Sequence, residues 1–240
     1  MAQPCGIRPR RRAAFPLCFT AGLLLMLAAV LGSVVWNASR TALFADGLSR
    51  YVAAAGVMSQ GDAETFAAET IGYLTGALDA WTPAVTVYGG ALIVPEAFAA
   101  HMAAVRSWML FLKTALPPGA ALGLLLLALC AWGGSRGGRG DAFSQGGYYA
   151  GAALPLAVTL GACLWAALDF NGFWSWLHTA FIPGGIFPAG ERIMALFPQA
   201  LFAGYIAPVG VTLAVCAAVV FLLPAGVRLL NRKTKKKAAA

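Results

Sequence analysis

Four long runs of apolar residues, separated by polar segments, dominate the sequence. They cover residues 15–36, 108–132, 148–168 and 204–227. A helix needs roughly 20 apolar residues to cross about 30 Å of hydrocarbon, so each run is long enough for one span. The pattern predicts an all-α integral membrane protein with four transmembrane helices, and it assigns residues 1–240 to a single membrane domain.

Three features qualify these runs. A basic segment precedes Phe15–Trp36, which also suits a signal peptide, but the run is longer than a usual signal core. Both interpretations leave the following chain on the same side of the membrane. Pro117–Pro118 predict a break or kink in the second span, and Pro155 predicts a tolerated kink in the third.

Composition excludes a soluble domain, because 60% of residues are hydrophobic, 11% are charged and the mean hydropathy is +0.75. The net charge of +8 would suggest a nucleic-acid partner in a soluble protein, but here its distribution points to membrane topology. Twelve of the 17 Lys and Arg residues lie before the first run, between the second and third, or after the fourth: Arg8, Arg10, Arg11, Arg12, Arg136, Arg139, Arg228, Arg232, Lys233, Lys235, Lys236 and Lys237. The positive-inside rule therefore places both termini and loop 133–147 in the cytoplasm, and segments 37–107 and 169–203 outside.

The first external segment contains signals for local structure. Ser59 and Asp62 can cap a helix that carries Phe66, Ile71 and Tyr73, and we expect this amphipathic helix to lie on the membrane. A short strand is predicted at Val85–Tyr88. Pro95–Glu96 predicts the start of the next helix, which carries His101.

The second external segment carries the other histidine of the chain. His178 follows Phe173, Trp174 and Trp176, aromatic residues typical of a membrane–water interface. A neutral imidazole with a pKa of about 6.5 suits general acid–base catalysis, although a histidine that only packs or bonds locally fits the same pattern. Both histidines lie near outer ends of antiparallel spans, so we expect their side chains within about 10 Å of each other.

Charged residues near the histidines are candidate partners. Asp169 and Glu191 can orient or balance an imidazole, and Arg106 and Arg192 can bind an anion, although each also suits an ordinary interfacial charge. We expect Asp169 or Glu191 to be the carboxylate nearest to the imidazoles. Ser175 stands three residues before His178, a spacing that suits a Ser–His pair for covalent acyl transfer, but the GxSxG pattern of a nucleophile elbow is absent.

Metal and cofactor signals are weak. No short-spaced ligand pair such as HExxH is present, and the five cysteines lack CxxC spacing, so no metal site and no cofactor are predicted. Four cysteines are expected in the apolar core: Cys18, Cys130, Cys163 and Cys216. Cys5 suits either lipidation, oxidation or an inert thiol. The Gly-rich loop 133–147 lacks a phosphate-binding motif and is predicted to be a flexible connector.

Two stretches carry a family resemblance. DFNGFWSWLH, followed by TAFIPGG and ERIMALFPQALF, resembles the signature of the lipoprotein intramolecular transacylases, bacterial proteins with four membrane spans. The matching residues are Asp169, Phe170, Phe173, His178, Phe181, Glu191 and Pro198, and in the second stretch His101, Met102, Val105 and Arg106, together with Tyr73. Three departures occur: Ala104 replaces a usual Asp, Glu191 replaces an Asp, and Phe187 lies near the place of a Trp after Gly184–Gly185.

The resemblance implies an activity. It implies transfer of an acyl chain from the diacylglyceryl group of a lipoprotein to the α-amine of its N-terminal Cys, at the external leaflet of the bacterial cytoplasmic membrane. The implied catalytic residues are His178 and His101, and the implied binding or orienting residues are Asp169, Glu191, Arg106, Arg192, Tyr73, Phe173 and Phe181. The implied partners are a diacylated lipoprotein and membrane lipid.

Two other classes of function remain open. A non-catalytic module that docks lipoproteins or lipid would use the aromatic loop and the amphipathic helix of the external segments. A transporter is disfavoured because polar residues are nearly absent from the middle of the spans and no paired broken helices are apparent.

Overall fold

The computed structural model describes residues 10–136, 143–182, 187–188 and 190–238, with the backbone alone for residues 10–13, 133–136, 228 and 230–238. Predictions that rest on Cys5, Arg8, Arg139 and Gly184–Gly185 lie outside the described residues, as do those on the side chains of the terminal basic clusters. The remaining predictions can be compared with the structure directly.

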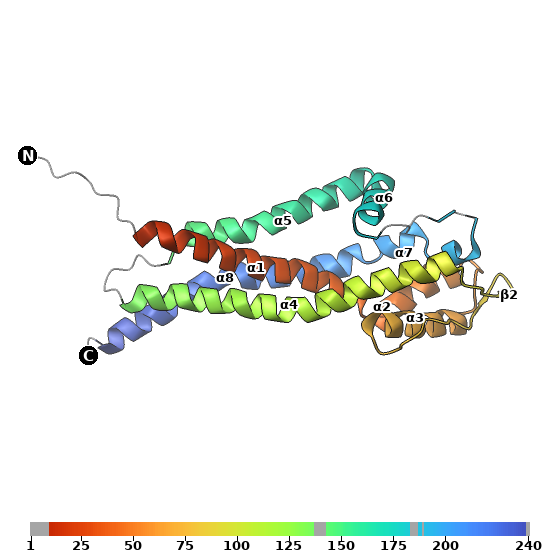
Figure 1. Ribbon diagram of the computed structural model, residues 1–240, viewed down its shortest axis with the longest axis horizontal. Coiled ribbons are helices and arrows are strands. Elements are labelled where there is room, and N and C mark those ends of the chain that lie inside the picture. The colour runs from red at the N-terminus through yellow and green to blue at the C-terminus, as the bar shows by residue number, and fades with distance from the viewer. Residues whose placement is uncertain (1–9, 137–142, 183–186, 189, 239–240) are drawn as a thin grey trace, which may run out of the picture. The chain divides into compact units, whose positions relative to one another are not determined.

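Four long helices carry the apolar runs: α1 (Arg10–Ala38), α4 (Glu96–Arg136), α5 (Gln145–Leu168) and α8 (Ile206–Ala238) (Figure 1). Each is long and apolar enough to cross a membrane, over Ala14–Ala38, Glu96–Trp132, Gln145–Leu168 and Ile206–Val227. The predicted all-α membrane fold with four spans is confirmed.

The shorter elements lie between the long helices. They are α2 (Thr41–Leu48), the π-helical turn η1 (Ser49–Ala53), α3 (Gln60–Thr75), strands β1 (Thr86–Val87) and β2 (Gly90–Ala91), α6 (Phe170–Phe181), the 3-10 helix η2 (Arg192–Leu196) and α7 (Gln199–Ala203). β1 and β2 pair antiparallel through a two-residue turn in which Tyr88 and Gly89 both have positive φ, as a type I′ hairpin requires. The predicted strand at Val85–Tyr88 is confirmed.

The candidate span in α4 is longer than a membrane needs. Its 37 residues, at about 1.5 Å per residue, extend about 55 Å, whereas the hydrocarbon is about 30 Å thick. A crossing over the predicted span, 108–132, would leave the first turns of α4 outside the hydrocarbon, and these bounds stay a prediction. The helix continues through Pro117 and Pro118, so the chain does not break there, and the alternative of a kink stays a prediction. Neighbouring groups can satisfy the freed backbone carbonyls of such a helix.

The chain divides into two compact units. The first comprises Met1–Leu31, Ala115–Gly161 and Leu213–Ala240, and the second comprises Gly32–Thr114 and Ala162–Thr212. Segments distant in sequence thus combine in each unit. The assignment to a single membrane domain stays a prediction.

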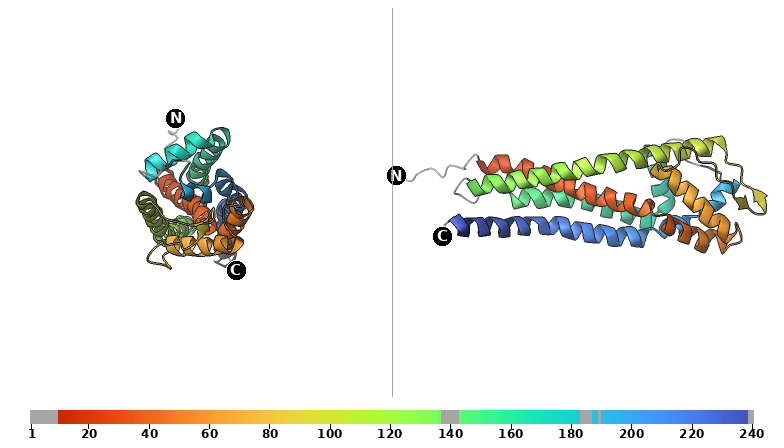
Figure 2. Two further views of the ribbon diagram at one scale, coloured as in Figure 1. Left: turned by 90° about the vertical axis from the view of Figure 1, so that its right-hand side faces the viewer. Right: turned by 90° about the horizontal axis from the view of Figure 1, so that it is seen from below.

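The first unit packs portions of α1, α4, α5 and α8 against one another, as two further views show (Figure 2). Its closest approach joins α1 to α5, because a Cβ on Gly151 would lie 2.0 Å from the Phe19 carbonyl oxygen. Small residues allow helix backbones to pack closely in membranes. The Tyr148 hydroxyl donates to the Val220 carbonyl at 2.8 Å and joins α5 to α8. Cys163, which belongs to the second unit, is exposed, so its assignment to the core is wrong.

The second unit has an aromatic core. Phe66 contacts Trp81 and Phe197 with ring centroids 5.9 Å apart in both pairs. The N-cap prediction for α3 is confirmed, because the Ser59 hydroxyl accepts the Asp62 backbone N–H at 3.0 Å. The prediction that this helix lies on the membrane is wrong. Its apolar face, including Phe66 and Ile71, is buried against the protein.

Candidate active site

The first turns of α4 position His101. The helix begins at Glu96, as predicted, and the Ala99 N–H bonds to the Pro95 carbonyl at 3.0 Å. Phe98 and Met102 are both 4% exposed and fix one face of the helix in the aromatic core of the second unit. His101 lies between them in sequence, and its ring packs at 5.8 Å from the ring of Phe98. The imidazole is therefore held by packing from its own helix.

Helix α6 positions His178. Asp169 caps the helix, and its Oδ1 accepts the Gly172 N–H at 2.9 Å. A Cβ on Gly172 would overlap the Asp169 carboxylate, so glycine permits this cap. His178 lies two turns later and is 6% exposed. The second external segment, which the sequence presented as a loop, is therefore helical where it carries the imidazole.

The two imidazoles lie side by side in the second unit. Their ring centroids are 5.4 Å apart and their planes differ by 22°, an approximately parallel arrangement. The predicted separation of at most about 10 Å is confirmed. These are the only two histidines in the chain, and they come from positions 77 residues apart.

The surroundings of His178 fix its neutral tautomer. Its Nδ1 lies 2.8 Å from the Trp174 carbonyl oxygen, one helical turn earlier. A carbonyl oxygen only accepts hydrogen bonds, so Nδ1 must carry the proton. In the neutral ring Nε2 then has the free lone pair. His178 thus presents a proton acceptor at Nε2.

Aromatic rings enclose the pair. Trp174 packs on His178 with ring centroids 4.5 Å apart. Phe187 meets His101 edge-on at 5.5 Å and packs at 4.9 Å from Phe98. Phe187 therefore supplies an aromatic contact near the place where the resembled family has a Trp. Such rings reduce the access of water and strengthen electrostatic interactions within the site.

His101 differs from His178 in its polar environment. Its Nδ1 is buried and has no hydrogen-bond partner among the described residues. Burial, followed by repulsion from the neighbouring His178, lowers the pKa of His101 to about 4. His101 lies before the predicted span, 108–132. The imidazole therefore remains neutral at neutral pH.

A second contact joins α4 to α6. The Trp108 indole N–H donates to the Phe181 carbonyl at 2.9 Å, and the two rings meet edge-on at 5.9 Å. Trp108 lies seven residues after His101, which is about two turns along the same face of α4. Phe181 lies three residues after His178 on α6. This contact therefore holds the two helices next to the imidazole pair.

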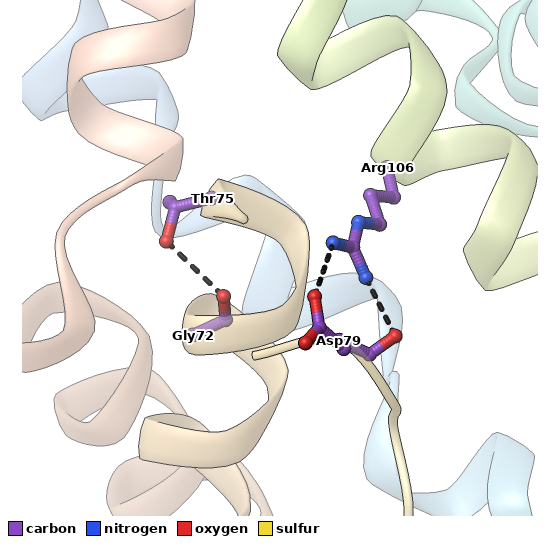
Figure 3. A network of polar contacts seen from close by, with 4 residues as sticks. All are labelled: Gly72, Thr75, Asp79 and Arg106. Atoms are coloured by element: carbon purple, nitrogen blue, oxygen red, sulfur yellow. Dashed lines mark hydrogen bonds and ion pairs between the residues drawn. The ribbon is translucent and has the colours of Figure 1, made fainter. Parts of the chain in front are cut away.

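Arg106 and Tyr73 are brought together by the structure. The guanidinium carbon of Arg106 lies 4.5 Å from the centroid of the Tyr73 ring, a cation–π geometry. Nη1 donates to the Asp79 carbonyl at 2.9 Å, and Nη2 lies 4.0 Å from the Asp79 carboxylate, as Figure 3 shows. Because Asp79 is fully exposed, this ion pair contributes little to stability. Arg106 is therefore held by the ring and the carbonyl.

The remaining predicted charges have different surroundings. Glu191 precedes η2, and its Oε2 is buried with no partner among the described residues. Arg192 is exposed and lies against β2, because a Cβ on Gly90 would be 2.7 Å from its Nη1. Asp169 is engaged in its helix cap. The expectation that Asp169 or Glu191 is the nearest carboxylate stays a prediction.

Other predicted residues are found in packing contacts. Phe173 packs edge-on against Trp165 at 5.7 Å, and Phe181 packs against Trp108 and Trp176. Ser175 is exposed, and no bond joins it to His178 in the described part of the chain, so a Ser–His pair gains no support. Among the described residues, no group of three or more His, Cys, Asp or Glu side chains could hold a metal ion.

The sequence analysis did not assign three contributors to the site: Trp174, which it named only as an interfacial aromatic residue, Phe98 and Trp108. A signal existed for each. Residues three or four positions apart lie on the same face of a helix. Trp174 lies four residues before His178, and Phe98 lies three residues before His101. Trp108 has heptad spacing from His101. None of these spacings indicates which residues form contacts until the partner helix is known.

The fold and the site together define a four-helix membrane protein with a closely packed pair of imidazoles. No family model matches the sequence, and no curated protein matches it. Among solved structures, the chain is similar to the membrane integral lipoprotein intramolecular transacylase Lit from Bacillus cereus, with a TM-score of 0.66. The match covers 96% of this chain and 98% of the other at 12% sequence identity. The resemblance noted in the sequence is thus confirmed at the level of the fold.

Proposed function

We propose that this chain is a membrane acyltransferase that moves an acyl chain within a lipoprotein, from the diacylglyceryl ester to the α-amine of the N-terminal Cys. The observation that carries the proposal is the pairing of the two histidines at 5.4 Å in an aromatic enclosure. Similarity of fold to a lipoprotein transacylase supports the substrate class. The positive-inside pattern supports a site at the external leaflet of a bacterial cytoplasmic membrane.

The proposed reaction begins at the α-amine. The amine nitrogen attacks the ester carbonyl carbon, and Nε2 of His178 accepts the proton that this nitrogen loses. The bond from Nδ1 to the Trp174 carbonyl holds Nε2 in the accepting state. An α-amine with a pKa of about 7.7 to 8.0 is well matched to an imidazole base.

His101 is assigned to the developing oxyanion. Its buried Nδ1 has no partner in the described part of the chain, and an unpaired donor there would be more costly than an unpaired acceptor. The proton of neutral His101 therefore belongs on Nε2, which can donate to the carbonyl oxygen. The lowered pKa keeps this imidazole neutral and so limits charge repulsion when His178 becomes protonated.

Collapse of the tetrahedral intermediate completes the transfer. The ester C–O bond breaks, the amide C–N bond remains, and protonated His178 returns its proton to the leaving glyceryl oxygen. The products are an N-acylated Cys and a lyso-glyceryl thioether, with no net change of mass. The reaction needs no cofactor or metal ion, because both proton transfers pass through an imidazole.

The site also has candidate binding residues. Arg106, held on Tyr73, and the exposed Arg192 can bind the anionic groups of lipid or peptide. Phe173 and Phe181 can contact acyl chains at the interface. Glu191 and Asp169 remain proposed orienting groups, and the buried Oε2 of Glu191 is available to a substrate amine.

The alternative of a non-catalytic docking module is weakened by the packing of α3. That proposal depended on an apolar helix face available to lipid, whereas Phe66 and Ile71 on that face are buried in the protein. The module still predicts a distinct outcome. It would bind lipoprotein but leave the lipid attachment unchanged.

The test compares how lipid is attached to the N-terminal Cys of a lipoprotein from cells with this protein and from cells without it. Because the transfer conserves mass, tandem mass spectrometry must locate the acyl chain, and an amine-specific reagent must count free α-amines. We expect blocked amines and an amide-linked acyl chain with the wild type, and neither with His178→Asn. Unchanged lipoprotein in the presence of well-expressed, membrane-inserted wild type would refute the proposal.

A further inference from the structure

A cavity lies in the second unit, where α2 and η1 meet α7 and the two residues between α7 and α8. Its volume is about 70 Å³, and the residues that matter to its chemistry are Leu43, Asp46, Arg50, Tyr51, Leu201 and Tyr205. A single water needs only about 10–15 Å³ of such space, so the cavity can hold a small polar group. Asp46 and Arg50 are exposed and give the cavity an open mouth.

Four polar side chains converge on this cavity without a protein partner. Within the described part of the chain, no hydrogen bond or ion pair engages the side chains of Asp46, Arg50, Tyr51 or Tyr205. The set contains one cationic donor, one anionic acceptor and two hydroxyls that can do both. Such a set matches a ligand that has both signs of charge.

A π-helical turn lies next to the two charges, which form no ion pair among the described residues. Asp46 and Arg50 are four residues apart, a spacing that favours an ion pair on an α-helix. The helix changes to η1 at Ser49, where the Ala54 N–H bonds to the Ser49 carbonyl, five residues earlier. π-helical turns are frequent at functional sites.

The cavity lies beside segment ends that border candidate spans. Tyr205 immediately precedes Ile206, the first residue of the fourth candidate span, and α2 begins three residues after Ala38 ends the first. Tyrosine is enriched at membrane–water interfaces. Polar groups of lipids are concentrated at that depth, so an amphiphile can place its headgroup here while its chains remain in the bilayer.

We propose that this cavity binds the headgroup of a zwitterionic phospholipid that has a primary ammonium group. Arg50 and the tyrosine hydroxyls hold the phosphate, since a guanidinium matches the geometry of phosphate oxygens. Asp46 holds the ammonium group. A purely anionic headgroup would satisfy Arg50 but would be repelled by Asp46, so the pair of charges selects the zwitterion.

The site is separate from the imidazole pair. Neither His101 nor His178 is among the residues that line the cavity. Lipid binding can therefore be measured without substrate turnover.

The experiment uses the full chain, purified in detergent and freed of lipid. Native mass spectrometry measures binding of phosphatidylethanolamine and phosphatidylglycerol to the wild type, Arg50→Gln and Asp46→Asn. We expect Arg50→Gln to weaken binding of both lipids about tenfold, the loss of one charge-assisted contact. Asp46→Asn should weaken binding of phosphatidylethanolamine by a similar factor, about tenfold, and should strengthen binding of phosphatidylglycerol, because the repulsion by the Asp46 carboxylate is removed.

Matched variants keep the result interpretable. Arg40→Gln and Glu64→Gln change exposed charges of the same unit outside the cavity and should leave binding unchanged. Tyr205→Phe removes only a hydroxyl and gives a second measure if a charge variant is unstable. Equal binding of both lipids by the wild type would overturn the proposal, as would full retention in Arg50→Gln and Asp46→Asn. Displacement of the lipid by inorganic phosphate alone would identify a simple anion site and would also overturn it.

Discussion

The two compact units bury different kinds of side chain. The core of the first unit consists of aliphatic, small and sulfur-containing residues, and its Tyr148 hydroxyl is satisfied by a backbone carbonyl. The second unit buries His178 and an aromatic cluster. It also contains the five buried side-chain atoms without a partner among the described residues, on Asn37, Ser39, Glu69, His101 and Glu191.

The contrast indicates which interactions matter most in each unit. Lipid is as apolar as the protein interior, so helices in a membrane associate through close packing of small residues. Buried polar groups that the protein does not satisfy are costly, and they persist where function requires them. The first unit is therefore expected to respond to changes of volume, and the second to changes of hydrogen-bonding chemistry.

The largest expected effect is on the chemistry of the second unit. His178→Asn keeps a donor that can reach the Trp174 carbonyl but removes the base at Nε2. We expect acyl transfer to fall by about 10²- to 10⁴-fold, the usual contribution of general acid–base catalysis. The rate of amide formation on a synthetic diacylated lipopeptide measures this loss. Cys216→Ala in the first unit should keep the wild-type rate. A comparable loss of rate in Cys216→Ala would show that sensitivity of the chemistry is not confined to the second unit.

The next effect concerns packing in the first unit. Gly151→Ala places a methyl group 2.0 Å from the Phe19 carbonyl oxygen, so α1 and α5 must separate. We expect a loss of about 1–3 kcal/mol of stability, seen as a lower Tm, with little change in kcat for the folded fraction. Gly161→Ala on the same helix has open space around the new Cβ and should have a Tm close to that of the wild type.

A smaller effect is expected from the contact between α4 and α6. Trp108→Phe keeps an aromatic ring but removes the N–H that bonds to Phe181. Misplacement of the imidazoles should lower kcat roughly 10- to 100-fold while KM and Tm change little. Trp36→Phe alters an exposed indole of the same unit and serves as the control. A parallel fall of Tm and kcat would instead assign Trp108 a purely structural role.

The smallest effect is a dependence of stability on pH. The folded-state pKa of His101 is about 4, below the ordinary value of 6.5, so the unfolded chain binds more protons between these two values. Stability contributed by neutral His101 is therefore complete above about pH 6.5 and declines as the pH falls toward 4. We expect Tm to fall over this window by less in His101→Asn than in the wild type. Identical pH profiles would contradict the assigned environment.

Much of the fold was predictable because its signals are local. Hydropathy and charge located the four spans, and the sequence Ser59–Asp62 located a helix cap. The convergence of His101 and His178 followed from topology alone, since both lie near span ends on one predicted face. The direction of the apolar face of α3 was not predictable, because periodicity does not distinguish lipid from a protein core.

Other features depend on contacts between distant segments. The continuity of α4 through Pro117 and Pro118 depends on groups outside the prolines themselves. The hydrogen bond from His178 Nδ1 to the Trp174 carbonyl requires α6 to be helical, in a segment whose sequence suggested a loop. The contact between Trp108 and Phe181 joins residues 73 positions apart, and no local pattern connects them.

The central claim is that the two imidazoles act as one catalytic unit, and a double-mutant cycle tests it most directly. Rates of amide formation are measured for the wild type, His178→Asn, His101→Asn and the variant with both changes. Residues that act as a unit have strongly non-additive effects, so we predict that the double variant is no slower than His178→Asn alone. Losses that multiply in the double variant would show that the two histidines act independently and would contradict the claim.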